Sequence, residues 1–168
     1  GPVGVSDRLL PFLPIPIVDK KEKEGNTKQF SWRSETHTEQ TIGKLSAFSG
    51  NSGILLRALS YALLLGDEGM ARVGEYATLN ANYLAARLSQ SGFQLAYPDR
   101  RATHEFIITF AQESKEHDVS AMDIAKRLLD YGFHAPTVSF PVAGTMMIEP
   151  TESENKEEID KFCDAMIS

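Results

Sequence analysis

Residues 120–150 read SAMDIAKRLLDYGFHAPTVSFPVAGTMMIEP and contain the signals for a helix, a loop and a strand in succession. Ser120 and Asp123 stand three residues apart, as in a capping box with Asp in place of Glu, so a helix begins here. Gly132 stands where a helix commonly ends in a left-handed residue. Residues 145–149 then read as a strand that Pro150 stops. The stretch therefore predicts a helix–loop–strand unit, and the apolar side of its helix consists of Ile124, Ala125, Leu128 and Leu129.

Similar patterns extend this unit in both directions. Downstream, Thr151 and Glu154 match a capping box and predict the start of a final helix. Upstream, residues 93–97 alternate and residues 104–110 are rich in Ile and Phe, as is typical of strands. The final helix is predicted to be amphipathic, because an apolar residue recurs at each step of three or four: Ile159, Phe162, Cys163 and Met166.

Two helices are predicted before these strands. Residues 54–65 are apolar on nearly every side, which favours a buried helix, and Gly66 stands at its expected end. Residues 67–90 form a second helix with one apolar face. The order helix, helix, strand, strand, helix, strand, helix predicts an α/β fold of the two-layer α+β type, with a small sheet and helices on one face.

The first 45 residues differ from the rest in composition. Residues 1–18 are rich in Gly, Pro and apolar residues. Residues 19–40 are polar, with alternating charges and no apolar periodicity, so a solvated and mobile loop is predicted there.

Composition and charge restrict the classes of function. The chain has 168 residues and a net charge of −6, with 42% apolar and 24% charged residues, as in ordinary globular proteins. This acidic balance argues against a nucleic-acid partner. The single cysteine, Cys163, excludes a disulfide framework and a multi-cysteine metal site, and no metal site is expected. The longest apolar run, residues 54–65, is too short to cross a membrane.

The loop and strand end of the opening stretch carry the strongest candidates for a site. His134 and Thr137 bring an imidazole and a hydroxyl to a loop, and loops often carry function. The alternative for His134 is an imidazole that satisfies local backbone carbonyls. Glu149 is held between the strand and a proline, and its alternative is an acidic residue at the positive end of the next helix.

Three further positions are possible site residues. His104, followed by Glu105, can do acid–base work, and strand alternation predicts that one of the pair faces inward. The alternative is a sheet-edge pair in solvent. Asn51 precedes a helix whose free N–H groups can bind an anion, and the alternative is ordinary capping. Gly4 lies in a Gly- and Pro-rich turn, which is alternatively a turn without function or a remnant of an expression tag.

Longer stretches resemble one family. Residues 125–137, AKRLLDYGFHAPT, are similar to the late part of glycine dehydrogenase (decarboxylating), the P-protein of the glycine cleavage system. Residues 140–145 and 148–154 continue the match in register. Gly50-Asn51, with Arg57-Ala58 after it, resembles the form of the enzyme whose two halves are separate chains. The resemblance covers nearly the whole chain apart from the polar loop, because it extends to HEFI at 104–107, LNANY at 79–83 and GPVGV at 1–5.

The resemblance implies a pyridoxal-phosphate enzyme of fold type I, the aspartate aminotransferase fold. It implies that glycine is decarboxylated and that the aminomethyl group passes to a lipoyl-bearing carrier protein, in bacterial cytoplasm or mitochondrial matrix. Residues 1–45 would be the end of the large cofactor domain plus the polar loop, and residues 46–168 the C-terminal small domain. In the family the Schiff-base lysine follows a histidine, and no His-Lys pair occurs here. No catalytic residue is therefore expected in this fragment, which would be inactive alone.

Within the parent enzyme, His134, Thr137 and Glu149 are expected to lie closest to substrate or cofactor. The expected partners are the rest of the enzyme or a second subunit, in a homo-oligomer. The alternative is a non-catalytic α/β module for ligand binding or dimerisation, which needs only the order of strands and helices and explains the missing lysine without truncation.

Overall fold

The computed structural model describes residues 3–23, 25, 27–34 and 40–168. Its contacts divide the chain into two compact units, Gly1–Ser60 and Tyr61–Ser168. The assignment of residues 1–45 to a larger cofactor domain stays a prediction. In the part of the chain that the structure describes, no helix is long and apolar enough to cross a membrane.

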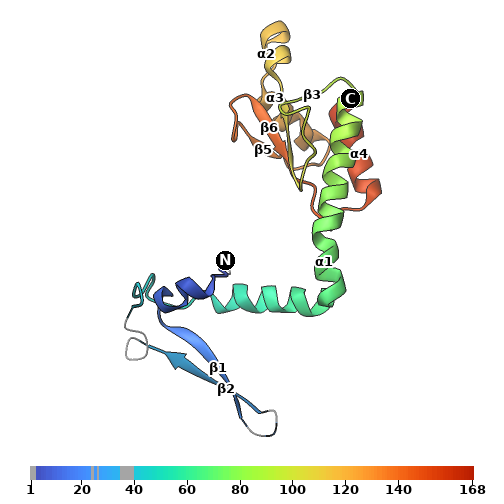
Figure 1. The fold of residues 1–168 in the computed structure, drawn as a ribbon. Helices are drawn as coiled ribbons and strands as arrows, with labels where there is room; N and C mark the ends of the chain where they lie inside the picture. The colour runs from blue at the N-terminus through green and yellow to red at the C-terminus, as the bar shows by residue number, and fades with distance from the viewer. Residues whose placement is uncertain (1–2, 24, 26, 35–39) are drawn as a thin grey trace. The chain divides into compact units, whose positions relative to one another are not determined.

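The first unit contains a short helix and a β-hairpin (Figure 1). The 3₁₀ helix η1 spans Asp7–Phe12, and the strands β1 (Ile17–Lys23) and β2 (Thr27–Arg33) pair antiparallel over their full length. The guanidinium of Arg33 forms an ion pair with the carboxylate of Asp19 near the open end of the hairpin. This pair joins the end of β2 to β1 by side chains as well as by the backbone ladder.

The hairpin shows that the predicted irregular loop over residues 19–40 is wrong for residues 19–23 and 27–33. Both strands are mostly exposed, so neither has the apolar alternation by which a half-buried strand is recognised. Instead, β2 carries the β-favouring residues Phe30 and Trp32, and Glu22 stands opposite Lys28. The parts of the prediction that concern residues 24, 26 and 35–39 lie outside the described residues.

Helix α1 spans Ser52–Gln90 and contains the two predicted helices, because Gly66 departs from helical geometry with φ 63° and ψ −173°. Within this chain the helix over residues 54–65 is not buried, since most of its large apolar side chains are 49–83% exposed: Ile54, Leu55, Leu56, Leu59, Leu63 and Leu64. Apolarity on every side identified a helix that can be buried, but the described residues do not cover it.

The second unit has a mixed α/β fold, as predicted. Its antiparallel sheet has the strand order β3 (Gln94–Leu95), β4 (Phe106–Thr109), β6 (Thr145–Ile148) and β5 (Thr137–Val138). The central strands β4 and β6 turn alternate side chains toward the core. Helices α1, α3 (Ala121–Asp130) and α4 (Lys156–Ile167) contribute buried side chains to the same core. The core is a single cluster that includes Leu84, Leu88, Phe106, Ile108, Leu128, Met146, Ile148, Ile159 and Cys163.

Two elements of the second unit were not predicted. Helix α2 (Ala111–His117) has the sequence AQESKEH and no buried residue, so it lacks an apolar stripe. Strand β5 (Thr137–Val138), like β3 (Gln94–Leu95), has only two residues, too few to show a period. Neither element has a local sequence pattern that could predict it, because α2 has no apolar face and β5 is defined by its pairing with β6.

The ends of the last two helices differ in how well local sequence predicted them. The capping box of α3 is confirmed, because Asp123 accepts from the backbone N–H of Ser120, at 3.0 Å, and donates its own N–H to the Ser120 hydroxyl. The predicted capping box at Thr151 is wrong, since α4 is capped by Asn155, whose side chain accepts from the Glu158 N–H at 3.0 Å.

The side chain of Asn80 on α1 gives the physical reason for this later start. Its Nδ2 donates to the carbonyls of Thr151 and Glu154 at 2.9 and 3.0 Å, and the Glu154 N–H donates to the Thr151 carbonyl at 3.3 Å. Residues 151–154 are thereby held as a turn, so the helix begins beyond them.

A group of charged and polar side chains joins α4 to α1, which lie side by side in Figure 1. The carboxylate of Asp160 accepts from Lys156 Nζ, Tyr83 Oη and Arg87 Nη1, each at 2.6 Å. These donors, Lys156 first and Tyr83 next, hold the pKa of Asp160 well below its usual range. The network therefore stabilises the packing of α4 mainly when Asp160 is ionised.

Asp160→Asn is expected to lower the urea midpoint of this chain at pH 7, because the variant loses a carboxylate that accepts from three donors. The folded-state pKa is depressed, so the carboxylate contributes fully above about pH 4, and the contribution is lost as the pH falls further. Urea unfolding at pH 7 and in acid measures this. Asp130→Asn, in the exposed pair with Arg127, is the control with the smaller expected loss. An equal loss for Asp160→Asn at both pH values would contradict the prediction.

Candidate functional site

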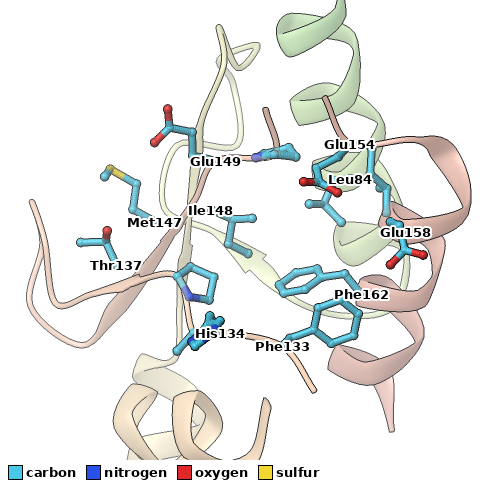
Figure 2. Close-up of a pocket in the computed structure, with 14 residues that line it drawn as sticks. Leu84, Phe133, His134, Thr137, Met147, Ile148, Glu149, Glu154, Glu158 and Phe162 are labelled. Carbon is cyan, nitrogen blue, oxygen red and sulfur yellow. The ribbon is translucent and has the colours of Figure 1, made fainter. Parts of the chain in front are cut away.

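A pocket of about 420 Å³ lies within the second unit (Figure 2). It is formed by the loop after α3, by β5, by the end of β6 and by parts of α1 and α4. His134, Thr137 and Glu149, the three principal residues predicted from the sequence, all line it. Tertiary structure thus brings together two segments that the sequence analysis selected separately.

The end of α3 places the first of these residues. Gly132 has φ 83° and donates its N–H to the Leu129 carbonyl, while Phe133 donates to the Leu128 carbonyl, both at 3.0 Å. These two bonds form a Schellman motif, which reverses the chain directly after the helix. Phe133 then packs edge to face against Phe162 of α4, with ring centroids 5.4 Å apart. His134 follows at once and therefore enters the pocket beside an aromatic wall.

The sheet places the other two residues. Thr137 of β5 pairs with Met147 of β6, and Glu149 follows Met147 by two positions, so strand alternation puts all three on one side. Figure 2 shows Thr137, Met147 and Glu149 on one side of the strand, with Ile148 on the side of Phe133. The pocket therefore has a polar edge along the strand and an apolar wall toward the core.

The charges around the pocket are mainly negative. Glu154 and Glu158 line it together with Glu149, and Lys161 Nζ lies 2.8 Å from Glu158 Oε1. The pocket also holds one imidazole and one hydroxyl, at His134 and Thr137. Such groups can orient a ligand by hydrogen bonds and can give or accept a proton.

No lysine lines the pocket, and every lysine in the chain is described and solvent-exposed. A lysine that binds a carbonyl cofactor covalently is activated by desolvation or by a neighbouring cation. The residues present therefore do not fit covalent attachment of pyridoxal phosphate. Within the described ranges there is also no group of three or more His, Cys, Asp or Glu side chains that could hold a metal ion.

The other predicted site residues lie outside this pocket. Asn51 belongs to the first unit and caps α1, because its side-chain oxygen accepts from the Ile54 N–H at 3.2 Å. Gly4 is exposed in the same unit, with open space around its α-carbon. His104 and Glu105 precede β4, and neither is buried, so the predicted inward-facing member of the pair is wrong. The pair lies at the end of the strand, where alternation no longer selects a buried face.

Sequence reasoning missed the aromatic wall of the pocket. Phe162 falls on the predicted apolar face of the last helix, and Phe133 is the residue that follows a helix-ending glycine. A residue at that position commonly contacts the last turn of the helix. Its position in a Schellman motif was therefore a usable signal for Phe133.

Comparison with known proteins identifies the family to which this chain belongs. The family model described as "Glycine dehydrogenase, C-terminal domain" matches residues 73–168. A protein of Methylococcus capsulatus named "Probable glycine dehydrogenase (decarboxylating) subunit 2" is 58% identical over 168 residues, which are 99% of this chain and 33% of that protein. Proteins with the same name from Coxiella burnetii and Thiobacillus denitrificans are each 56% identical over 99% of this chain.

Two solved structures resemble the fold. The crystal structure of a glycine decarboxylase (P-protein) in inhibitor-bound form has a TM-score of 0.69 and 18% identity, covering 96% of this chain and 36% of that one. A structure titled as a NifS-like protein has a TM-score of 0.52 and 15% identity over 80% of this chain and 36% of that one. At such identities these likenesses concern the fold alone.

The fold is thus one that occurs in a solved glycine decarboxylase structure. The chain belongs to the glycine dehydrogenase (decarboxylating) family, and its residues 73–168 correspond to the C-terminal domain of that family. It spans about one third of the length of the curated relatives it matches.

Gly132→Ala is expected to destabilise the second unit by about 1–2 kcal/mol, because an L-residue at φ 83° is strained. Gly74→Ala is the matched control. Gly74 lies inside α1, and an added Cβ meets nothing within 4 Å. That variant should gain up to about 1 kcal/mol from the higher helix propensity of Ala. Urea unfolding monitored by circular dichroism measures both, and equal stability of Gly132→Ala and the wild type would rule out the assigned conformation.

Proposed function

We propose that this chain is the C-terminal part of a glycine decarboxylase. The whole enzyme would decarboxylate glycine with pyridoxal phosphate and pass the aminomethyl group to a lipoyl-bearing carrier protein. The observation that carries this proposal is the 58% identity, over nearly the entire chain, to a protein named as subunit 2 of that enzyme. The pocket then provides a place where this chain can contribute to the reaction.

The proposed role of the pocket is to bind and orient a reacting group. His134 would contact substrate, cofactor or the arriving lipoyl arm by its imidazole. Thr137 would add a hydrogen bond, and Glu149 would support that geometry from the end of β6. The apolar wall, which includes Phe133 and Phe162, would exclude water and strengthen these polar interactions.

The cofactor would be held mainly by other parts of the enzyme. Pyridoxal phosphate supplies an electron sink for decarboxylation when it is bound. The nine lysines of this chain, which include Lys44, are all exposed, so the Schiff-base lysine is expected in the remaining two thirds of the enzyme. The chain is accordingly expected to be inactive by itself.

The proposed partners are the chains or domains that would cover the exposed apolar surface of α1. The first half of α1 presents Leu55, Leu59 and Leu63, which are 55–75% exposed. Apolar surface of this kind is usually covered by another chain or domain. The rest of the enzyme, or a second subunit in a homo-oligomer, is proposed to cover it. The bacterial sources of the relatives favour bacterial cytoplasm over mitochondrial matrix as the compartment.

His134→Gln in the complete enzyme is expected to lower kcat/KM for glycine decarboxylation by about 10-fold or more, because a misplaced or missing contact at the reacting group slows the reaction. Exchange of labelled bicarbonate with the carboxyl group of glycine measures the rate. His117→Gln is the matched control, since His117 lies on exposed α2 outside the pocket. Equal activity of the two variants would refute a role for His134, and an inactive wild-type enzyme would refute the proposed function.

This chain alone is expected to show no stoichiometric labelling of one lysine by pyridoxal phosphate and borohydride. Exposed lysines lack the desolvation that favours a nucleophilic amine at neutral pH, so any labelling should be partial and spread over several positions. Intact-mass analysis followed by peptide mapping distinguishes the patterns. One label per chain at a single site, Lys44 in particular, would show that the chain has its own cofactor lysine.

A further inference from the structure

The antiparallel ladder between β4 and β6 brings two glutamates together at its end. Phe106 pairs with Ile148, and the next step along the same register places Glu105 opposite Glu149. Like charges directly opposite each other on neighbouring strands destabilise the pair. A basic group placed near both carboxylates would reduce this repulsion at the end of the sheet.

The imidazole of His104 lies between these carboxylates. Its Nε2 is 3.9 Å from Glu105 Oε2 and 3.9 Å from Glu149 Oε1. Its Nδ1 lies 3.2 Å from the hydroxyl oxygen of Thr103. When that hydroxyl donates to Nδ1, the ring proton is on Nε2 and points toward the two glutamates.

The two glutamates line different hollows. Glu149 lines the pocket of His134, whereas Glu105 lines a second pocket of about 510 Å³ beside α1 and the loop before β4. His104 lines neither of them. His104 is linked to a residue of the first pocket by its contact with Glu149.

Because the side chains of His104 and Glu149 are both about half exposed, we expect their contact to affect the position of Glu149 more than the stability of the fold. The side chains of His104 and Glu149 are 55% and 51% exposed, and ion pairs in such surroundings contribute little to stability. Glu154 and Glu158 add further negative charge to the same pocket. Among the described residues, the basic partner within salt-bridge distance of Glu149 is His104.

We propose that His104 is a positioning residue for Glu149. Its imidazole, which lies within ion-pair distance of both carboxylates, keeps the Glu149 carboxylate at the edge of the pocket and apart from Glu105. This inference rests on the proposed function, in which Glu149 supports the geometry of the reacting group.

The contact itself can be tested without enzyme activity. Long-range ¹H–¹⁵N spectra of the imidazole rings in this 168-residue chain report the tautomer and surroundings of His104. Glu149→Gln and Glu105→Gln should each shift the His104 ring resonances, and the proton should lie on Nε2. Glu116→Gln, on exposed α2, is the control that should leave them unchanged. Unchanged His104 resonances in Glu149→Gln would overturn the proposal.

A double-mutant cycle in the complete enzyme tests the functional consequence. His104→Gln is expected to lower kcat/KM by about 10-fold, as a misplaced contact does, with an unchanged urea midpoint. His104→Gln combined with Glu149→Gln should be no slower than Glu149→Gln alone, because the histidine acts through the glutamate. Additive losses in the cycle would overturn the positioning role. An enzyme that does not decarboxylate glycine would refute the proposed function, and the spectra would still decide the contact.

Discussion

The pairing of β4 with β6 is the constraint on which the second unit depends. Its register, from Phe106↔Ile148 to Thr109↔Thr145, directs Ile108 and Met146 into the core between α1, α3 and α4. A shift of one residue would turn these side chains to the other face of the sheet. Glu105 and Glu149 are the next residues beyond this register, so the packing of the core and the geometry of the pocket edge are set by one ladder.

Helix ends supply the remaining geometry of the site. Both α1 and α3 end in a glycine with positive φ, at Gly92 and Gly132, followed by a phenylalanine that returns its N–H to the last helical turn. Phe93 packs on Phe110 beside the sheet, and Phe133 packs on Phe162 beside the pocket. The same local motif therefore closes the core in one place and builds an apolar wall next to His134 in the other.

Local sequence signals predicted where helices begin and end better than they predicted which residues surround each element. The capping box at Ser120 and the break at Gly66 depend on neighbours within a few residues, and both appear in the structure. The β1–β2 hairpin was missed because its strands are exposed on both faces, and Thr151 was misassigned because Asn80, 71 residues away, binds its carbonyl. Residue chemistry suggested His134, Thr137 and Glu149, but their meeting in one pocket depends on strand pairing that no short pattern encodes.

The apolar first half of α1 also shows that local sequence does not predict what surrounds an element, and here the free energy of burial makes the point. Burying a leucine side chain contributes about 1.5–3 kcal/mol, so a segment with Leu55, Leu59 and Leu63 exposed leaves a large stabilisation unrealised within this chain. Periodicity reports how many sides of a helix can be buried, while the identity of the covering surface is a property of the assembly. The relatives are about three times as long as this chain, and the additional length of such a protein would supply the surface proposed to cover the first half of α1.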